Sequence, residues 1–228
     1  MTPPDEVRRA FLTGVVLAAG ASARMGRPKQ LLPVGDRCLL QRVVDAALAS
    51  RLDEVIVVLG HRAEEIRGSI ALPGDGRARA VVNPEFARGQ STSLQRGLRA
   101  ADARSQALAV LLGDQPCVTG DLIDRVAEAF LSAGAPLARP VYPDAGGAPG
   151  HPVFLARRVW PQIEDLSGDQ GARGLLAARP DWLLEVPVPG DPPPDVDTWE
   201  DYQRVASGYG TGRRAAPPSD RSRPKGTR

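Results

Sequence analysis

An abrupt change of character at residues 15–29, VVLAAGASARMGRPK, constrains this chain more than any other feature. The apolar start predicts a strand buried in a parallel sheet, since such strands are covered on both faces. Gly20 and Gly26 then allow a tight turn and a close approach of the backbone to a ligand, because they carry no Cβ. Backbone N–H groups at such a turn, together with Arg24 and Lys29, favour a polyanion. The pattern therefore predicts a nucleoside triphosphate site.

Two common phosphate-binding motifs do not fit this loop. A Walker A loop follows the pattern Gly-x-x-x-x-Gly-Lys-Ser/Thr, whereas five residues separate Gly20 from Gly26 and Arg27-Pro28-Lys29 comes next. A dinucleotide-binding Gly-x-Gly-x-x-Gly pattern would need glycine at position 22, which is serine. Pro28 also prevents a helix from running straight through the loop. The loop is therefore of another type, the alternative being a surface turn with incidental basic residues.

The composition fits one domain in a reducing compartment. With 228 residues, of which 42% are hydrophobic, the chain can bury a full core. No stretch approaches the roughly 20 apolar residues of a membrane span, and residues 1–9 lack the apolar region of a signal peptide. Cys38 and Cys117 form no Cys-x-x-Cys pair, which argues against disulfides and a thiolate metal site. We therefore expect a cytoplasmic protein with no membrane partner.

The net charge of +2 conceals two regions of opposite sign. Residues 213–228 contain six basic residues and one acidic residue, so this tail carries +5 and residues 1–212 carry −3. The tail is rich in Pro, Gly, Ser and Arg, a composition typical of disorder. We expect an N-terminal extension over residues 1–12, one domain over residues 13–206 and a disordered basic tail over residues 207–228, with no nucleic-acid partner.

Short apolar runs alternate with amphipathic segments along most of the chain. The runs predict strands over 14–19, 54–59, 79–83, 107–112, 137–142, 152–156 and 183–188. The amphipathic segments predict helices over 38–50, 63–70, 91–103, 121–133, 170–178 and 198–206. This alternation is typical of an α/β fold whose largely parallel sheet is covered by helices on both faces.

Two aspartates are candidate ligands for a magnesium ion. Asp114 follows the predicted strand 107–112, and open α/β sheets bind ligands beyond the carboxyl ends of their strands. Mg²⁺ is usually held by one or two carboxylates together with phosphate oxygens. The alternative for Asp114 is an aspartate that stabilises a turn. Asp197 precedes the last predicted helix and is either its N-cap or a second metal ligand.

Three further segments carry polar residues suited to ligand contact. Residues 83–94, where a strand passes into a helix, contain the hydroxyl residues 91–93. Capping the helix explains one of these hydroxyls, and the others suit a base or a phosphate. His151 lies in a Gly-His-Pro segment and is interpreted as a substrate contact in preference to a general base. Arg173 is in the first turn of a predicted helix, where a cation gains nothing from the helix dipole, which indicates an anionic partner.

These segments together resemble the motifs of the MobA-like nucleotidyltransferases, over about Gly14 to Val205. Residues 17–29 and Leu112-Gly113-Asp114-Gln115-Pro116 are similar to motifs of the whole superfamily. The segments similar to its molybdenum cofactor cytidylyltransferase branch are Asn83-Pro84, Gly89-Gln90-Ser91-Thr92-Ser93-Leu94, Gly150-His151-Pro152, Gly168-Asp169-Gln170-Gly171-Ala172-Arg173 and Asp195-Val196-Asp197-Thr198. The resemblance implies a Rossmann-like, three-layer nucleotidyltransferase fold with a mixed, mostly parallel central sheet.

The resemblance also implies an activity, namely transfer of CMP from CTP to the terminal phosphate of the molybdenum cofactor (molybdopterin), with Mg²⁺ and with release of pyrophosphate. It implies catalytic roles for Arg24 and Lys29 and metal ligation by Asp114 and Asp197. The implied nucleotide contacts are Leu17, Ala18, Ala19, Gly20, Ser22, Lys29, Ser91, Ser93 and Gly113. The implied contacts to the second substrate are Gln115, Pro116, His151, Asp169 and Arg173. An apo molybdenum hydroxylase is the partner expected to receive the product.

Ala19 favours CTP, because guanylyl-transferring relatives typically carry Leu-Ala-Gly-Gly where this chain has Leu17-Ala18-Ala19-Gly20. A guanylyl or sugar-1-phosphate transferase on the same fold stays open as an alternative. So does an NAD(P)H-dependent oxidoreductase of the nicotine-blue type, although the loop lacks the dinucleotide glycine pattern. A non-catalytic carrier of the cofactor is a third alternative, and it is disfavoured by the intact set of Arg24, Lys29, Asp114 and Asp197.

Overall fold

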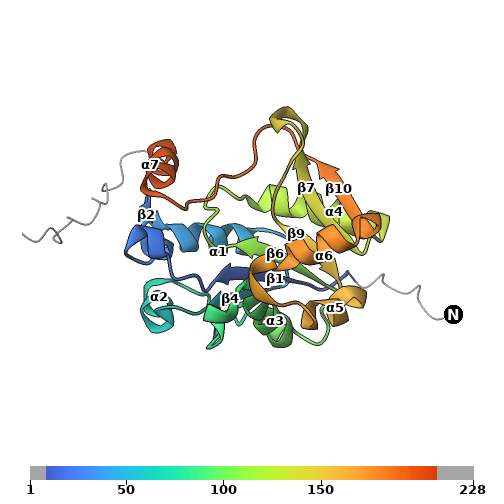
Figure 1. The fold of residues 1–228 in the computed structure, drawn as a ribbon, viewed down its shortest axis with the longest axis horizontal. Helices are drawn as coiled ribbons and strands as arrows, with labels where there is room; N and C mark the ends of the chain where they lie inside the picture. Colours follow the sequence, from blue (N-terminus) through green and yellow to red (C-terminus); the bar gives the residue numbers. More distant parts are fainter. Residues whose placement is uncertain (1–8, 210–228) are drawn as a thin grey trace, which may run out of the picture.

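A large sheet flanked by helices, with a small hairpin beside it, makes up the part of the chain that the computed structural model describes, residues 9–209 (Figure 1). Residues 210–228 of the tail predicted over 207–228, and residues 1–8 of the predicted N-terminal extension, lie outside the described residues. Ser207 and Gly208, which the prediction placed in that tail, belong to the last helix, Trp199–Gly208. Within residues 9–209, no helix is both long enough and apolar enough to cross a membrane.

The main sheet is formed by β1 (Leu12–Ala18), β4 (Glu54–Leu59), β5 (Ala78–Val82), β6 (Ala107–Leu112), β7 (Leu137–Tyr142), β8 (Ala148–Pro149), β9 (Val153–Ala156) and β10 (Leu183–Pro187). The strand order is β10–β7–β9–β6–β1–β4–β5, with β8 paired to β7. Neighbouring strands are parallel from β6 through β1 and β4 to β5, and again between β10 and β7. Strand β9 runs antiparallel to both β6 and β7. The sheet is therefore mixed and mostly parallel, as predicted.

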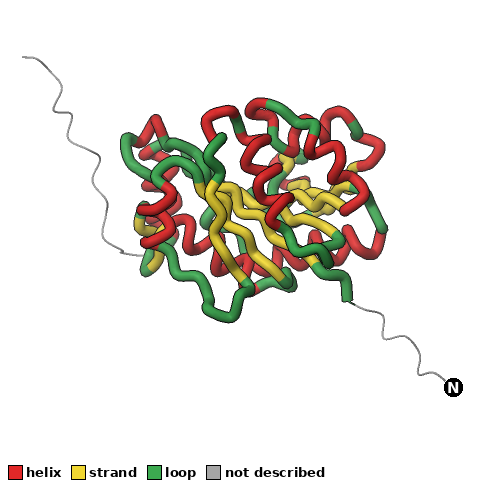
Figure 2. Tube along the Cα trace, turned by 90° about the horizontal axis from the view of Figure 1, so that it is seen from below, coloured by secondary structure: helices red, strands yellow, loops and turns green. Residues whose placement is uncertain are grey.

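Helices cover both faces of this sheet (Figure 2). The helices of one face are α1 (Leu39–Ala49), α2 (Ala63–Ser69) and α4 (Gly120–Ala133), and their apolar side chains belong to one buried cluster. Those of the other face are α3 (Gln90–Ala100), α5 (Trp160–Glu164) and α6 (Ala172–Ala178), which share a second cluster. A seventh helix, α7 (Trp199–Gly208), packs on the hairpin of β2 (Pro33–Val34) and β3 (Arg37–Cys38). This three-layer arrangement confirms the predicted Rossmann-like fold.

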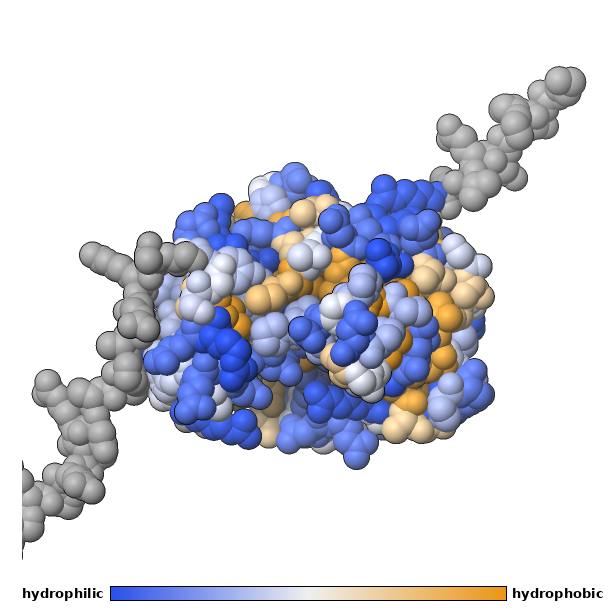
Figure 3. Space-filling view, turned by 90° about the horizontal axis from the view of Figure 1, so that it is seen from above, coloured by the Kyte–Doolittle hydropathy of each residue, from blue (hydrophilic) through white to orange (hydrophobic). Residues whose placement is uncertain are grey.

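Alternation along the central strands explains the two buried clusters, because successive strand residues point to opposite faces. Val16 of β1 packs on the side of α1 and α4, and Val15 packs on the side of α3. All six residues of β4 are buried, including Glu54, whose carboxylate accepts from Thr13 and pairs with Arg79 at 2.7 Å. Each fully buried aliphatic side chain contributes about 1.5–3 kcal/mol to folding. On the surface seen from above, apolar residues gather in a central band bordered by hydrophilic ones (Figure 3).

Local capping sets the ends of the helices that lead into the site. Helix α4 starts where the Thr119 side chain accepts from the backbone of Leu122, and it ends at Gly134 in the left-handed conformation. Helix α7 starts with a capping box, in which the side chains of Thr198 and Asp201 each accept a backbone hydrogen bond. Thr198 is therefore the N-cap of α7. Of the two roles predicted for Asp197, that of N-cap is wrong.

The predicted strands 54–59, 107–112 and 137–142 coincide with β4, β6 and β7. Strand β1 starts at Leu12, two residues before its predicted start and inside the segment expected to be an N-terminal extension. The hairpin of β2 and β3, the strand β8 and the helix α5 were not predicted. Strands of two residues and a helix of five residues are too short to leave a periodic pattern.

Candidate active site

Two adjoining cavities lie where β1 and β6 end. The first has a volume of about 550 Å³ and includes the loop after β1, and the second has a volume of about 510 Å³ and reaches toward β7 and α6. Leu17, Leu112 and Gln90 line both cavities, so the two meet at these side chains. The position agrees with the rule that open α/β sheets bind ligands beyond the carboxyl ends of their strands.

Strands β1 and β6 approach each other closely at this junction. The backbone N–H of Gly113 donates to the carbonyl of Leu17 at 2.9 Å. A Cβ on Gly113 would lie 2.9 Å from the Cβ of Ala18 and 3.0 Å from the oxygen of Leu17. Glycine at position 113 is therefore required for the backbone after β6 to reach the loop after β1.

Gln30 holds the loop after β1 in shape. Its side-chain amide donates to the carbonyls of Ala18 and Gly20, each at 3.1 Å, and only 3% of the residue is exposed. Ser22, in the left-handed conformation with φ of 52°, donates to Gln30 at 3.2 Å and accepts from the backbone N–H of Lys29 at 3.1 Å. Gln30 was not predicted from the sequence. Its only signal was an amide side chain next to a predicted ligand-binding lysine.

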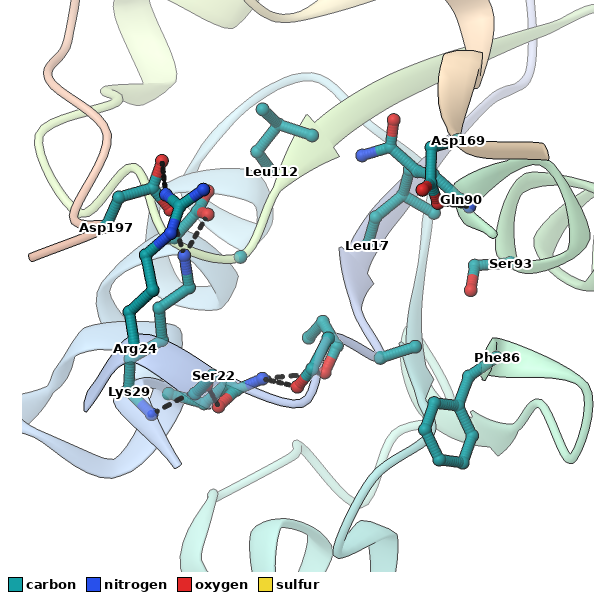
Figure 4. Close-up of a pocket in the computed structure, with 16 residues that line it drawn as sticks. Leu17, Ser22, Arg24, Lys29, Phe86, Gln90, Ser93, Leu112, Asp169 and Asp197 are labelled. Carbon is teal, nitrogen blue, oxygen red and sulfur yellow. Dashed lines mark hydrogen bonds and ion pairs between the residues drawn. The ribbon is translucent and has the colours of Figure 1, made fainter. Parts of the chain in front are cut away.

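Lys29 lies between the two aspartates predicted as metal ligands. Its Nζ is 2.7 Å from Asp114 Oδ2 and 2.8 Å from Asp197 Oδ1. Burial by itself lowers the pKa of Lys29, but the charges and hydrogen bonds of the two carboxylates together raise it above its usual value. Arg24 stands further out, 3.9 Å from Asp197 and with 77% of its side chain exposed. Figure 4 shows the labelled side chains of Arg24, Lys29 and Asp197 together at one end of the first cavity.

The segment before α7 delivers Asp197 to this cluster. The backbone N–H of Val196 donates to the carbonyl of Asp114 at 3.0 Å, which ties the segment to the end of β6. Asp195 accepts from Gln115 at 2.9 Å, and burial, followed by the charge of Asp114, raises the pKa of Asp195. Two loops that are distant in the sequence thus bring three carboxyl groups close together.

The two carboxylates bound to Lys29 suit a magnesium ion that takes its other ligands from phosphate and water. They do not suit a metal whose ligands all come from the protein. Among residues 9–209, no group of three or more His, Cys, Asp or Glu side chains is arranged to hold a metal. Asp114 Oδ1 is buried and has no hydrogen-bond partner among the described residues, so this atom is available as a ligand. Mg²⁺ is usually held by one or two carboxylates plus phosphate oxygens and water. The donor set therefore suits Mg²⁺ that binds together with phosphates.

The other end of the first cavity is uncharged except for Asp169. Phe86, Gln90, Ser93 and Asp169 lie there, away from Lys29 (Figure 4). Phe86 packs directly on Gly60, where a Cβ would come within 2.6 Å of its side chain. An aromatic ring and a hydroxyl suit a planar base, whereas the cationic end suits phosphates.

Asn83 organises the hydroxyl residues at the start of α3. Its Nδ2 donates to Thr92 Oγ1 at 2.9 Å and to Ser93 Oγ at 3.0 Å. Gly89, which is the N-cap of α3, leaves no room for a Cβ, because the backbone of Gly168 would lie 2.4 Å away. The N-cap of α3 is therefore a glycine, and no side-chain hydroxyl caps this helix. Ser93 lines the first cavity.

The second cavity contains two arginines, the aspartates Asp191 and Asp195, and a neutral histidine. Arg139 and Arg173 line it, and Arg139 pairs with Glu185 at 2.5 Å. Arg173 forms no ion pair with any residue in the range 9–209 that the structure describes. Burial, and secondarily the charge of Arg173, lowers the pKa of His151 to about 4, so this imidazole is uncharged at neutral pH. Arg139 was not predicted, since an arginine within an apolar strand carries no motif.

Most of the residues singled out in the sequence line one of the two cavities. Those that line the first are Leu17, Ala18, Ala19, Gly20, Ser22, Arg24, Lys29, Ser93, Gly113, Asp114, Asp169 and Asp197. Those that line the second are Leu17, Gln115, His151 and Arg173. Two predicted contacts line neither cavity. The hydroxyl of Ser91 is buried without a hydrogen-bond partner among the described residues, and the carbonyl of Pro116 accepts from the hydroxyl of Tyr209.

The family follows from comparison with known proteins. Residues 14–182 match the model of the MobA-like NTP transferase domain. This chain belongs to that family. Membership places it among the nucleotidyltransferases, in agreement with a loop that combines glycines with Arg24 and Lys29 at the end of β1.

Two curated relatives cover nearly the whole chain. Nicotine blue oxidoreductase of Paenarthrobacter nicotinovorans is 32% identical over 210 residues, which is 85% of this chain and 96% of that protein. Purine catabolism protein PucB of Bacillus subtilis is 33% identical over 207 residues, which is 87% of this chain and 98% of that protein. One of these names specifies an oxidoreductase, and the other specifies a role in purine catabolism.

The fold is also that of a solved structure, Rv0371c from Mycobacterium tuberculosis. This structure superimposes with a TM-score of 0.76 at 35% identity, covering 87% of this chain and 98% of that one. A second structure of Rv0371c is described as a complex with manganese, with a TM-score of 0.72 at 33% identity and the same coverage.

Proposed function

We propose that this chain transfers CMP from CTP to the terminal phosphate of the molybdenum cofactor and releases pyrophosphate. One observation carries the proposal: the first cavity, with Lys29 between two carboxylates, meets a second cavity with basic side chains at the ends of β1 and β6. A nucleotide in the first cavity and an anionic acceptor in the second would have their reacting groups at this junction. The motif resemblance supports the molybdenum cofactor as acceptor, and Ala19 supports CTP.

The acceptor phosphate serves as its own nucleophile in this reaction. A phosphomonoester has a second pKa of about 6, so it is mostly dianionic at neutral pH. Attack of its oxygen on the α-phosphorus of CTP therefore requires no general base. His151, with its pKa lowered to about 4, is too weak a base to be needed and serves as a hydrogen-bonding contact. A reaction without a general base thus agrees with a site whose basic residues, such as Lys29 and Arg173, are charged and do not accept a proton at neutral pH.

Positioning and charge neutralisation are then the tasks of the protein. Arg173 and Arg139 hold the acceptor phosphate in the second cavity. Lys29 and Arg24 neutralise the triphosphate and the charge that develops as pyrophosphate leaves. Backbone N–H groups of residues 19–22 contact the nucleotide, and Ser93 contacts its base or sugar.

Asp114 and Asp197 are the residues that would hold Mg²⁺, which supplies further neutralisation of phosphate charge when bound. Gln30 keeps Lys29 and the loop amides in register through its two carbonyl contacts. The relative described with manganese supports a divalent cation in this family. An apo molybdenum hydroxylase is the proposed recipient of the finished cofactor.

The test is incubation of the purified chain with Mg²⁺, molybdenum cofactor and one of CTP, GTP or UTP. Pyrophosphate release and the mass of the product are measured in each case. We expect a cytosine dinucleotide product with CTP only. A guanine product would replace the proposal by guanylyl transfer, and no product with any nucleotide would refute it.

An oxidoreductase is the second candidate, because a relative that covers 85% of this chain bears the name nicotine blue oxidoreductase. The loop after β1 lacks the dinucleotide glycine pattern, and it has serine at position 22. Oxidation of NADH or NADPH in the presence of the dye distinguishes this candidate. Dye reduction without nucleotidyl transfer would favour it over the proposal.

A further inference from the structure

Of the two basic side chains that line the first cavity, Lys29 forms the shorter ion pairs. Its ammonium contacts one oxygen of Asp114 and one of Asp197, and only 14% of its side chain is exposed. An ammonium at 2.7 and 2.8 Å from two carboxylates neutralises part of the negative charge that would otherwise attract a divalent cation. In this arrangement Lys29 and a metal ion compete for the same two carboxylates.

The backbone of Lys29 is held by the loop, whereas its ammonium is held only by the two carboxylates. Its N–H donates to Ser22, and the loop is closed by Gln30. The ammonium is carried on a flexible four-carbon stem. A triphosphate in the cavity would offer this ammonium phosphate oxygens in place of carboxylate oxygens, without any change of fold.

We propose that Lys29 acts as a placeholder cation, which binds Asp114 and Asp197 in the nucleotide-free protein and yields them to the divalent cation when a triphosphate binds. The inference rests on the proposed function for the identity of the triphosphate. Two carboxylates alone are a weak site for the metal, and Lys29 weakens it further. The triphosphate removes the competing ammonium and adds oxygen ligands, so metal and nucleotide bind cooperatively.

Arg24 provides a matched comparison. It carries the same charge on the same loop, but its contact to Asp197 is 3.9 Å and its side chain is 77% exposed. Removing Arg24 changes the local charge by the same amount without opening the space between the two carboxylates. A general electrostatic effect would make both variants alike, whereas a placeholder role belongs to Lys29.

The experiment is a titration of Mn²⁺ into the full chain without nucleotide, in which electron paramagnetic resonance measures free Mn²⁺. We expect Lys29→Met to bind Mn²⁺ at least about tenfold more tightly than the wild type, within the range of about 5–150-fold typical of coupling between sites. Arg24→Met should change the affinity less than about threefold. Lys29→Arg keeps a cation and should remain close to the wild type. The double variant Lys29→Met, Asp114→Asn should lose the gain.

Equal Mn²⁺ affinity of Lys29→Met and the wild type would overturn the proposal, and so would an equal gain in Lys29→Arg. Thermal unfolding of each variant establishes that it is folded before the titration is read. The same titration with saturating CTP should tighten Mn²⁺ binding in the wild type and leave Lys29→Met less affected. Calorimetry that shows no CTP binding would refute the proposed function, whereas the nucleotide-free comparison decides the role of Lys29 by itself.

Discussion

The two cavities differ in how their charges are compensated. In the first, Lys29 is paired with Asp114 and Asp197, so the cations and anions of the protein satisfy one another. In the second, Arg139 is paired with Glu185, but Arg173 has no ion-pair partner in the part of the chain that the structure describes. The first cavity therefore has to exchange internal contacts for ligand contacts, whereas the second, which Asp191 and Asp195 also line, offers the guanidinium of Arg173 to an anion. Under the proposed function, this difference suits one cavity to a metal–triphosphate pair and the other to a phosphorylated acceptor.

The largest effect is expected at Asp114. Asp114→Ala should reduce pyrophosphate release from CTP by about 1,000-fold, comparable with the loss of a central electrostatic contact to a transition state. The fold should survive, because Asp114 is in a loop and its contact to Val196 is made by the backbone carbonyl, which alanine retains. Asp195→Asn, which changes a neighbouring carboxyl group, should have a much smaller effect. Turnover at the wild-type rate in Asp114→Ala would contradict a metal-ligand role.

The second cavity is tested by Arg173→Ala. Its KM for the acceptor should rise by about 10-fold to 100-fold, as expected from the loss of a charged hydrogen bond worth about 1.5–3 kcal/mol. The KM for CTP should stay unchanged, since Arg173 does not line the first cavity. Arg179→Ala is the control, because Arg179 pairs with Asp181 and stacks on Trp182 outside both cavities. An equal rise in both KM values would mean that the cavities are not separate subsites.

Helix α3 connects the two cavities through Gln90, and its packing can be tested at Gly97. A Cβ there would lie 2.4 Å from Val15 Cγ1, so Gly97→Ala should destabilise the protein by about 1–3 kcal/mol. Gly68→Ala in α2 is the matched control, because nothing lies within 4 Å of its Cβ position. This control should be neutral or stabilise by about 0.5–1 kcal/mol. Urea unfolding measures both, and equal stabilities would show that α3 tolerates a shift away from β1.

The smallest effect concerns the pH dependence of stability at His151. Its pKa is lowered to about 4 in the folded protein, so the unfolded chain takes up a proton first as the pH falls. Above about pH 6.5 the imidazole is neutral in both the folded and the unfolded protein, so it does not change the pH dependence of stability. As the pH falls from about 6.5 to about 4, the free energy of unfolding decreases. We expect His151→Asn to remove about 1 kcal/mol of this decrease, less than the full pKa shift implies, because part of the residue is exposed and solvent screens its charge. Melting temperatures at pH 7 and pH 4.5 check this, with His61→Asn as control, and identical pH dependence in all three proteins would contradict it.

Local patterns predicted the fold well where elements were long. Strands β4, β6 and β7 are continuous apolar runs because both faces of the sheet are covered, and their limits were predicted correctly. Strand β9 was predicted as a strand, but its antiparallel direction depends on pairing with β6 and β7. Direction and order in a sheet are set by contacts between distant segments, which one strand's own sequence does not encode.

The sequence by itself determined the strand–loop unit at residues 15–29, the aspartate after β6 and the alternating α/β pattern, because each depends on residues that are close along the chain. Only the tertiary structure decided that Lys29 binds Asp114 and Asp197, which are 85 and 168 positions away. It also brought Arg139 to the second cavity, gave Gln30 its two carbonyl partners and withdrew Ser91 and Pro116 from both cavities. The physical reason is that charge pairing and burial are properties of three-dimensional neighbours, and folding selects these neighbours through the whole core.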